Sequence, residues 1–191
     1  MNLEKLKKPL TVEHIDFKVS MLVQTKSGDV MASILAYKDA RVDMNILDES
    51  VGPENWQNEY RRDSNGVLQC GIGVRISEVS DYGTNSYWAW KWSNGTPSDF
   101  EGEKGEYSDA FKRAGFMWGI GRSLYDFPSI WLYLSEGDWY IDEKTKKPRA
   151  SAKLRPNDWT WEVSEDYKTV TASRKFGNEW KQIYNSNPYK K

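Results

Sequence analysis

The sequence predicts an α+β fold built from antiparallel strands: a β-hairpin, a helix, a three-stranded sheet packed by a long helix, and a small β-rich extension. Three observations predict it. Apolar residues alternate at a period of two in several segments, they recur at steps of three and four in only two, and turn sequences separate the alternating segments. The 191 residues suit one domain with an appendage, so we expect a core domain over residues 1–127 and an extension over residues 128–191.

The hairpin and the first helix are predicted near the N-terminus. Apolar residues alternate from Ile15 to Val23, residues 26–29 supply a turn, and residues 30–36 are again apolar. Apolar residues then recur at helical spacing as far as Val51, and Gly52 with Pro53 ends the helix. Arg41 is expected at the edge of this apolar stripe, half toward water.

Three strands are predicted next, over residues 56–60, 67–79 and 87–92, with turn sequences between them. In the third strand Trp88, Trp90 and Trp92 share one face because strand side chains alternate. Two interpretations of this face stay open. Large buried rings favour a core beneath a helix, whereas exposed rings would provide a surface on which nucleobases stack.

A long helix is predicted over residues 106–125, followed by short strand candidates over 131–141, 160–163 and 169–174. On a helical wheel Lys104 and Arg122 coincide, and Lys112 and Arg113 also lie away from the apolar stripe. The helix would contain three glycines, each costing about 1 kcal/mol relative to Ala. We therefore expect another backbone to come close to the helix, either within the fold or across a subunit boundary. The three are Gly115, Gly119 and Gly121.

Charge is unevenly distributed along the chain. Residues 1–143 hold 15 basic and 23 acidic side chains, whereas residues 144–191 hold 12 and 5, so the formal net charge of −1 is a cancellation. The sequence KTKKPRASAKLR over residues 144–155 carries six basic residues and no acidic one. It is predicted as a loop or arm, either solvated or reaching DNA or a neighbouring subunit.

Composition argues against several classes of protein. A single Cys70 and a single His14 exclude an internal disulfide, a cysteine-rich zinc site and a poly-histidine metal site. No apolar stretch is long enough to cross a bilayer, the N-terminus has no apolar signal core, and no Gly-Lys-Ser/Thr sequence for phosphate binding occurs. We expect a soluble cytosolic protein with no cofactor, no metal and no covalent catalysis.

One enzymatic alternative is a metal-dependent nuclease, which would use clustered carboxylates and a lysine. Asp142, Glu143 and Lys144, with Asp138 or Asp126 upstream, could supply them. The acidic pair Asp39 and Asp43 is instead interpreted as part of a solvated helix face. Abundant Trp and Tyr interleaved with Lys and Arg favour a protein that binds single-stranded nucleic acid.

Two sequence runs support that interpretation by resemblance. EGEKGEYSDAFKRAGFMWGIGRSLY over residues 101–125, preceded by YKDARVDMNILDESVGPENW over residues 37–56, resembles the Rad52/22 family of single-strand annealing proteins, especially its short phage and bacterial members. The similarity covers about residues 9–127, and SDAFKRA over 108–114 is its most specific part. It implies the same order of elements, assembly into rings or arcs, and DNA in a positively charged outer groove.

The resemblance also implies roles for particular residues. Lys112 and Arg113 would lie on the groove floor with Arg41 beside them, holding phosphates and leaving base edges outward. Relatives carry a further Arg where this chain has Phe116, so the groove is either less basic here or completed from elsewhere. The remaining candidate DNA contacts come from the basic helix flank and the arm. They are Lys104, Arg122, Lys146, Lys147 and Arg149.

The sequence therefore predicts a homo-oligomer that binds single-stranded DNA and anneals complementary strands without ATP, in recombination and repair in the cytoplasm of a bacterial host cell. Its expected partners are single-stranded DNA, copies of itself and a host single-strand binding protein. The alternatives are a passive single-stranded DNA-binding module, the metal-dependent nuclease, and a structural oligomer with incidental charge. The sequence leaves open the number of subunits, the binding of duplex DNA and the role of residues 128–191.

Overall fold

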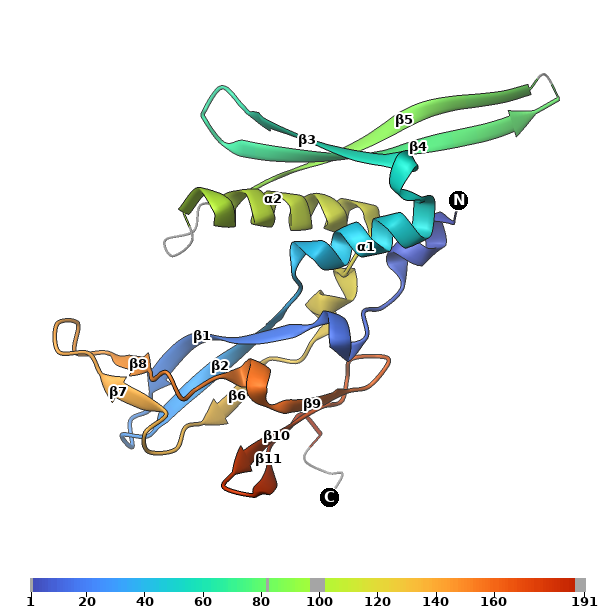
Figure 1. Cartoon of the computed structure of the whole chain (residues 1–191). Coiled ribbons are helices and arrows are strands. Elements are labelled where there is room, and N and C mark those ends of the chain that lie inside the picture. The colour runs from blue at the N-terminus through green and yellow to red at the C-terminus, as the bar shows by residue number, and fades with distance from the viewer. Residues whose placement is uncertain (1, 82, 97–101, 188–191) are drawn as a thin grey trace. The chain divides into compact units, whose positions relative to one another are not determined.

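The computed structural model describes residues 2–81, 83–96 and 102–187, and it contains two compact units (Figure 1). The first unit comprises Met1–Pro9 and Lys38–Arg122, and the second comprises Leu10–Tyr37 and Ser123–Lys191. The N-terminal hairpin therefore belongs to the same compact unit as the C-terminal residues. The division into a 1–127 core domain and a 128–191 extension stays a prediction.

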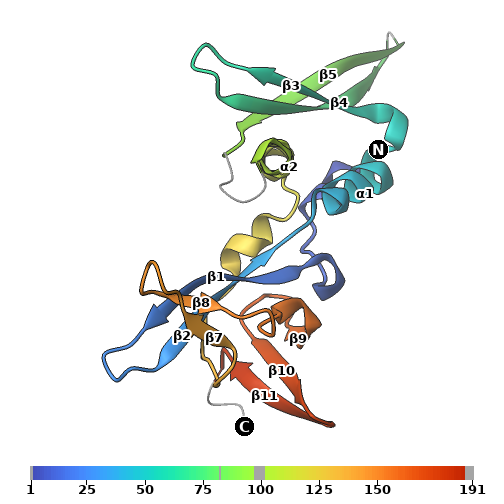
Figure 2. The same ribbon diagram turned by 60° about the vertical axis from the view of Figure 1, so that its left-hand side comes forward.

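The first unit packs two helices against one sheet. The helices are α1 (Ala40–Val51) and α2 (Gly102–Trp118), and the strands are β3 (Trp56–Arg62), β4 (Leu68–Ser80) and β5 (Gly83–Asn94). The sheet is antiparallel with the order β3-β4-β5, and α2 lies along one of its faces, as the view along α2 in Figure 2 shows. The predicted α+β class and the order of these elements are confirmed.

The core of the first unit lies between the sheet and the two helices. Alternate residues of β4 point toward α2 because strand side chains alternate, and Ile72 and Val74 are fully buried there. They pack with Phe111 and Ala114 of α2 and with Leu47 of α1. This contact between sheet and helices fixes the position of α2, which carries three of the candidate binding residues, Lys104, Lys112 and Arg113.

The long helix is shorter than predicted, and its glycines explain why. Gly119 and Gly121 have φ angles of 107° and 71°, a left-handed conformation that ends a helix, so α2 ends at Trp118. Gly115 lies inside α2, and a Cβ there would lie 2.8 Å from Oδ1 of Asp43 in α1. The close approach at Gly115 therefore occurs within the fold, and the group that approaches is a side-chain carboxylate of α1 where another backbone was expected.

The face of β5 that carries the tryptophans points away from α2. Lys91 is on the helix side, where its Nζ donates to the Met117 carbonyl, so its neighbours in the strand face the other way. Trp90 and Trp92 pair with Gly73 and Gly71 on that opposite face. The interpretation of these rings as core beneath a helix is therefore wrong.

The second unit consists of short antiparallel strands. One sheet has the order β1-β2-β6, a second has the order β11-β10-β9, and β7 pairs with β8. The strands are β1 (Asp16–Gln24), β2 (Val30–Tyr37), β6 (Ile130–Tyr133), β7 (Trp139–Ile141), β8 (Pro148–Ala150), β9 (Thr160–Val163), β10 (Val170–Phe176) and β11 (Glu179–Asn185). The structure adds β11 and places β8 inside the basic arm, which was predicted as a loop.

Aromatic packing and one ion pair hold the second unit together. The ring of Phe17 stacks on that of Trp161 with centroids 3.8 Å apart and an angle of 7° between planes. Asp138 is buried and accepts two hydrogen bonds from the Arg174 guanidinium, at 2.7 and 2.8 Å. Tyr167 donates a hydrogen bond to the Leu10 carbonyl, which joins the two ends of this unit's chain.

Short 3-10 helices occur between the larger elements: Leu3–Lys7, Val12–His14, Pro53–Asn55, Arg122–Asp126 and Pro156–Asp158. In the part of the chain that the structure describes, no helix is long and apolar enough to span a membrane.

Candidate nucleic-acid interface

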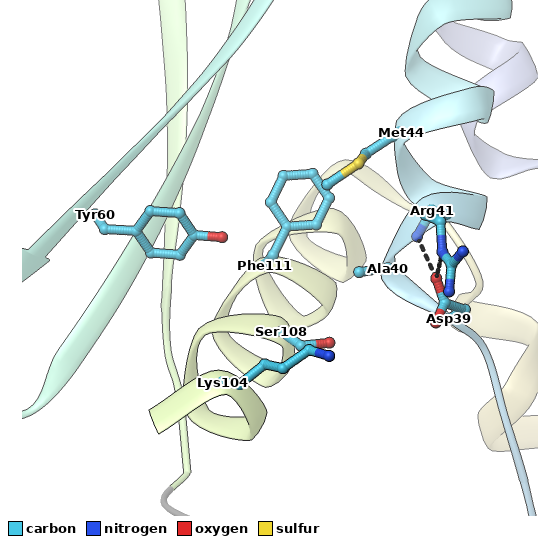
Figure 3. Close-up of a pocket in the computed structure, with 8 residues that line it drawn as sticks. All are labelled: Asp39, Ala40, Arg41, Met44, Tyr60, Lys104, Ser108 and Phe111. Atoms are coloured by element: carbon cyan, nitrogen blue, oxygen red, sulfur yellow. Dashed lines mark hydrogen bonds and ion pairs between the residues drawn. The ribbon is translucent and has the colours of Figure 1, made fainter. Parts of the chain in front are cut away.

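A hollow of about 690 Å³ opens in the first unit between the start of α1 and the first half of α2 (Figure 3). Its base is apolar, with Phe111 buried and Met44 beside it, and Tyr60 reaches it from β3. Its rim is polar and charged. The lining residues are Asp39, Ala40, Arg41, Met44, Tyr60, Lys104, Ser108 and Phe111.

Arg41 stands at the rim of the hollow and is held by the residue that starts α1. Asp39 caps the helix by accepting a hydrogen bond from the Arg41 backbone N–H at 2.8 Å, and its Oδ1 also lies 2.9 Å from Nε of Arg41. These bonds from Arg41 lower the pKa of Asp39. The Arg41 side chain is nevertheless 84% exposed, so its guanidinium contacts the Asp39 carboxylate and is also open to solvent.

Lys104 and Lys112 bring further positive charge from α2. Lys104 is exposed and lines the hollow together with Ser108, one turn farther along the helix. Lys112 is half-buried, and its charge acts on Asp39 and Asp43, so it lies on the side of α2 that faces α1. Cations from both helices thus surround the hollow, as a site for an anionic ligand requires.

A buried ion pair lies behind this surface. Lys38 and Asp43 are 2% and 0% exposed, and Nζ of Lys38 donates to Oδ1 of Asp43. Nζ also lies 4.5 Å above the ring of Phe116, and Oδ2 of Asp43 has no hydrogen-bond partner among the described residues. Burial raises the pKa of Asp43 to about 6 and lowers the pKa of Lys38, because low polarity disfavours both charges.

Sequence reasoning missed this pair. Asp43 was interpreted as part of a solvated helix face, which is wrong, and Lys38 was not singled out. The available signal was Gly115, because a glycine inside a helix indicates that something approaches the helix closely, and here that group is the Asp43 carboxylate.

Arg113 does not line the hollow, although it follows Lys112 in sequence. Its Nε lies 2.8 Å from Oδ2 of Asp109, one turn earlier, and the same carboxylate oxygen accepts a hydrogen bond from the Thr96 backbone N–H. The Arg113 side chain is 46% exposed. Lys112 and Arg113 therefore present their charges on different sides of α2, Lys112 toward α1 and Arg113 toward the end of β5.

Arg122 lies beyond the opposite end of α2 from Lys104. Because the helix ends at Trp118, the two residues do not share a helical face as the wheel predicted. The Arg122 guanidinium instead donates to the carbonyls of Phe116 and Met117, at 2.6 and 2.9 Å. The Phe116 carbonyl also accepts from the Gly119 backbone N–H at 3.0 Å, and the Met117 carbonyl also accepts from Lys91, so Arg122 is a second donor to each at the C-terminal end of the helix.

The three basic residues of the arm lie in the second unit. Lys146, Lys147 and Arg149 are exposed on the hairpin formed by β7 and β8. Asp142 organises the turn by accepting two hydrogen bonds from Thr145, both at 2.7 Å, and these bonds lower its pKa. The first part of the arm therefore forms the turn and the second strand of a hairpin, and its contact with DNA stays a prediction.

The carboxylates proposed for a nuclease have other partners. Asp138 is paired with Arg174, and Asp142 holds the turn at Thr145. Within the described residues, no group of three or more His, Cys, Asp or Glu side chains could hold a metal ion. Cys70 is buried, which raises the pKa of its thiol to about 12.

Comparison with known proteins bears on the whole first unit. Residues 2–135 match the family described as Rad52/22 family double-strand break repair protein. A search among curated proteins finds no match. The family match covers more than half of the chain and includes α1, the sheet and α2, which together form the hollow. The chain therefore belongs to the Rad52/22 family, whose members act in DNA repair and recombination.

Proposed function

We propose that this protein binds single-stranded DNA and anneals complementary strands without ATP, as a homo-oligomeric ring or arc. Family membership supports the broad role in repair and recombination. The observation that carries the proposal is the hollow in the first unit, where Arg41 from α1 and Lys104 from α2 present exposed cations, with Lys112 alongside.

The mechanism is electrostatic. A single strand carries one negative charge per nucleotide, and two strands repel each other until cations reduce that charge. Arg41 and Lys104 would contact phosphates at the rim, while the apolar base of the hollow packs against sugar. Hollows on neighbouring subunits would extend one strand along the oligomer. Bases facing outward could then pair with a second strand, and no bond is made or broken.

The exposure of Arg41 suits this role. Its guanidinium contacts the Asp39 carboxylate that also caps α1, but water screens this exposed pair, so the guanidinium can still donate to a phosphate. The carboxylate also offsets part of the positive charge. We therefore expect each subunit to bind single-stranded DNA with moderate affinity. The affinity of the oligomer should be higher because one strand contacts several subunits at once.

The binding test removes the charges in pairs. Arg41→Gln with Lys104→Gln, and separately Lys112→Ala with Arg113→Ala, should abolish or strongly weaken binding to an oligothymidylate at moderate salt. The slope of log affinity against log salt should flatten by about 0.7 for each lost phosphate contact. Fluorescence anisotropy at several salt concentrations measures both quantities, and sedimentation should show that the oligomers remain.

A matched control removes two exposed cations from the second unit, Lys26→Gln with Lys175→Gln. This control should change the affinity little. If the variant with Arg41→Gln and Lys104→Gln binds as tightly as the wild type, with the same salt slope, the assignment of the hollow is wrong.

Annealing is tested separately from binding. Two labelled complementary strands should pair faster with the protein than without it, in buffer that contains no ATP. Strands that are bound but pair at the uncatalysed rate would indicate a passive binding module. Cleavage of labelled DNA in the presence of magnesium would indicate the nuclease instead.

A further inference from the structure

The sheet of the first unit has a second face, on the side opposite α2, and aromatic rings cover part of it. Trp88, Trp90 and Trp92 of β5 lie there beside Arg75, Gly73 and Gly71 of β4, their partners in the register. Arg61 of β3 faces the same way, since it pairs with Gln69 of β4. In Figures 1 and 2 no labelled element of the first unit covers this face. We call these five side chains, Trp88, Trp90, Trp92, Arg61 and Arg75, the tryptophan face.

Two of the rings lie flat on the sheet. A Cβ on Gly71 would lie 2.5–2.7 Å from three neighbouring atoms of the Trp92 indole, and one on Gly73 would lie 2.8–2.9 Å from the same three atoms of Trp90. The missing Cβ atoms therefore let each ring rest face-down on a glycine. The other face of each ring points away from the sheet; on Trp92 the Arg61 guanidinium covers that face, and no described side chain is recorded over that of Trp90.

The rings form one surface and not isolated side chains. The centroids of Trp90 and Trp92 are 5.8 Å apart with 24° between their planes. Trp88 continues the row toward the tip of the β4–β5 hairpin and is 39% exposed. A stacked pair of rings with a third, exposed indole beside it is the kind of aromatic surface on which flat bases stack.

Positive charge accompanies the rings. The guanidinium carbon of Arg61 lies 3.8 Å from the centroid of the Trp92 ring, close enough for a cation–π contact. Arg75 lies directly across from Trp88 and is exposed. Guanidinium groups at both ends of an aromatic row complement a ligand that carries flat bases on an anionic backbone.

We propose that the tryptophan face is a second binding surface for single-stranded DNA, at which nucleobases stack on the indole rings. It goes beyond the hollow, which lies on the α2 side of the sheet and holds phosphates, and it relies on the proposed function only for the kind of strand bound. The two surfaces differ in chemistry: the hollow recognises charge, whereas the tryptophan face recognises bases.

The test compares two probes of equal length: an oligothymidylate, and an abasic oligonucleotide that has the same phosphates without bases. Trp88→Ala should weaken binding of the oligothymidylate about 5- to 150-fold, the range for loss of one stacked base, and leave binding of the abasic probe unchanged. Trp88→Phe should retain most of the affinity because a phenyl ring still stacks. Trp88 is chosen because it is the most exposed of the three rings, so its removal should leave the fold intact.

Trp131→Ala is the matched control, since Trp131 of β6 is 38% exposed but lies in the second unit. It should change the affinity for neither probe.

Loss of charge at the hollow should weaken binding of both probes. An error in assigning the hollow and an error in assigning the tryptophan face therefore give different results. Equal affinities of Trp88→Ala and wild type for the oligothymidylate would overturn the proposal, as would an equal loss for both probes. A change in the sedimentation of DNA-free Trp88→Ala would also overturn it, by identifying this face as a contact between subunits.

Discussion

Basic side chains lie near both ends of α2, but their contacts differ. Near the start of the helix, Arg41 and Lys104 stand exposed around a hollow. At the end, Lys91 and Arg122 donate to the carbonyls of the last turn. Cations at a helix C-terminus satisfy unpaired acceptors and the negative end of the helix dipole. A positive charge on a side chain therefore says little about its role. The groups to which its N–H donors already donate indicate that role better.

The middle of α2 differs from both ends, because there the charges are buried. The Lys38–Asp43 pair lies against Gly115 and joins α1 to α2. It holds in place the two helices from which the exposed cations project. Each of these three regions leads to a separate prediction about stability or binding.

The largest effect is expected from breaking the buried pair. Asp43→Ala leaves the Lys38 ammonium buried without its partner and should lower the free energy of unfolding by about 3–5 kcal/mol. Lys38→Met combined with Asp43→Leu removes both charges and should cost much less. Urea denaturation of the three proteins measures this. A loss below about 1 kcal/mol for Asp43→Ala would show that the pair does not anchor α1 to α2.

The same pair should give the chain an unusual titration. The pKa of Asp43 is about 6 in the folded protein against 3.8 ordinarily, so between these values the folded state holds a proton that the unfolded state lacks. This group's stabilising contribution is present below pH 4 and is lost as the pH rises through 6. Lys38→Met should raise the pKa further, since it removes the charge that favours the carboxylate. Carboxyl-carbon NMR titration measures both values, and a midpoint near 4 would contradict the prediction.

The end of α2 depends on a backbone conformation. Gly119 has φ of 107°, which is strained for any residue with a Cβ, and a Cβ there would lie 2.9 Å from Cγ of Lys7. Gly119→Ala should therefore lower the free energy of unfolding by about 2 kcal/mol. Gly28→Ala is a control with a similar φ of 96° but no atom within 4 Å. An equal loss in the two variants would show that only the backbone matters.

Local sequence patterns were sufficient to predict the helices and the three strands of the first unit. Non-local packing explains what these patterns missed. The period of two and the helical spacing predicted β3, β4, β5 and both helices, because they record which side chains share a face. They do not record which face the rest of the chain covers, so the side occupied by Trp90 could not be assigned. The burial of Asp43 depends on Gly115, which is more than 70 residues away in the sequence. The helical wheel placed Arg122 on the same face as Lys104 because it continued the helix past Gly119, where the helix has already ended.

The smallest effects test the comparison between the two ends of α2 directly. Arg122→Ala removes hydrogen bonds to two carbonyls that each keep another donor, and the side chain is exposed, so it should lower the free energy of unfolding by no more than about 1 kcal/mol. It should leave the salt dependence of DNA binding unchanged. Lys104→Ala should do the opposite, flattening the salt slope by about 0.7 per lost phosphate contact with little effect on stability. If Arg122→Ala flattened the slope as much as Lys104→Ala, both ends of the helix would contact the strand, and the bound DNA would extend well beyond the hollow.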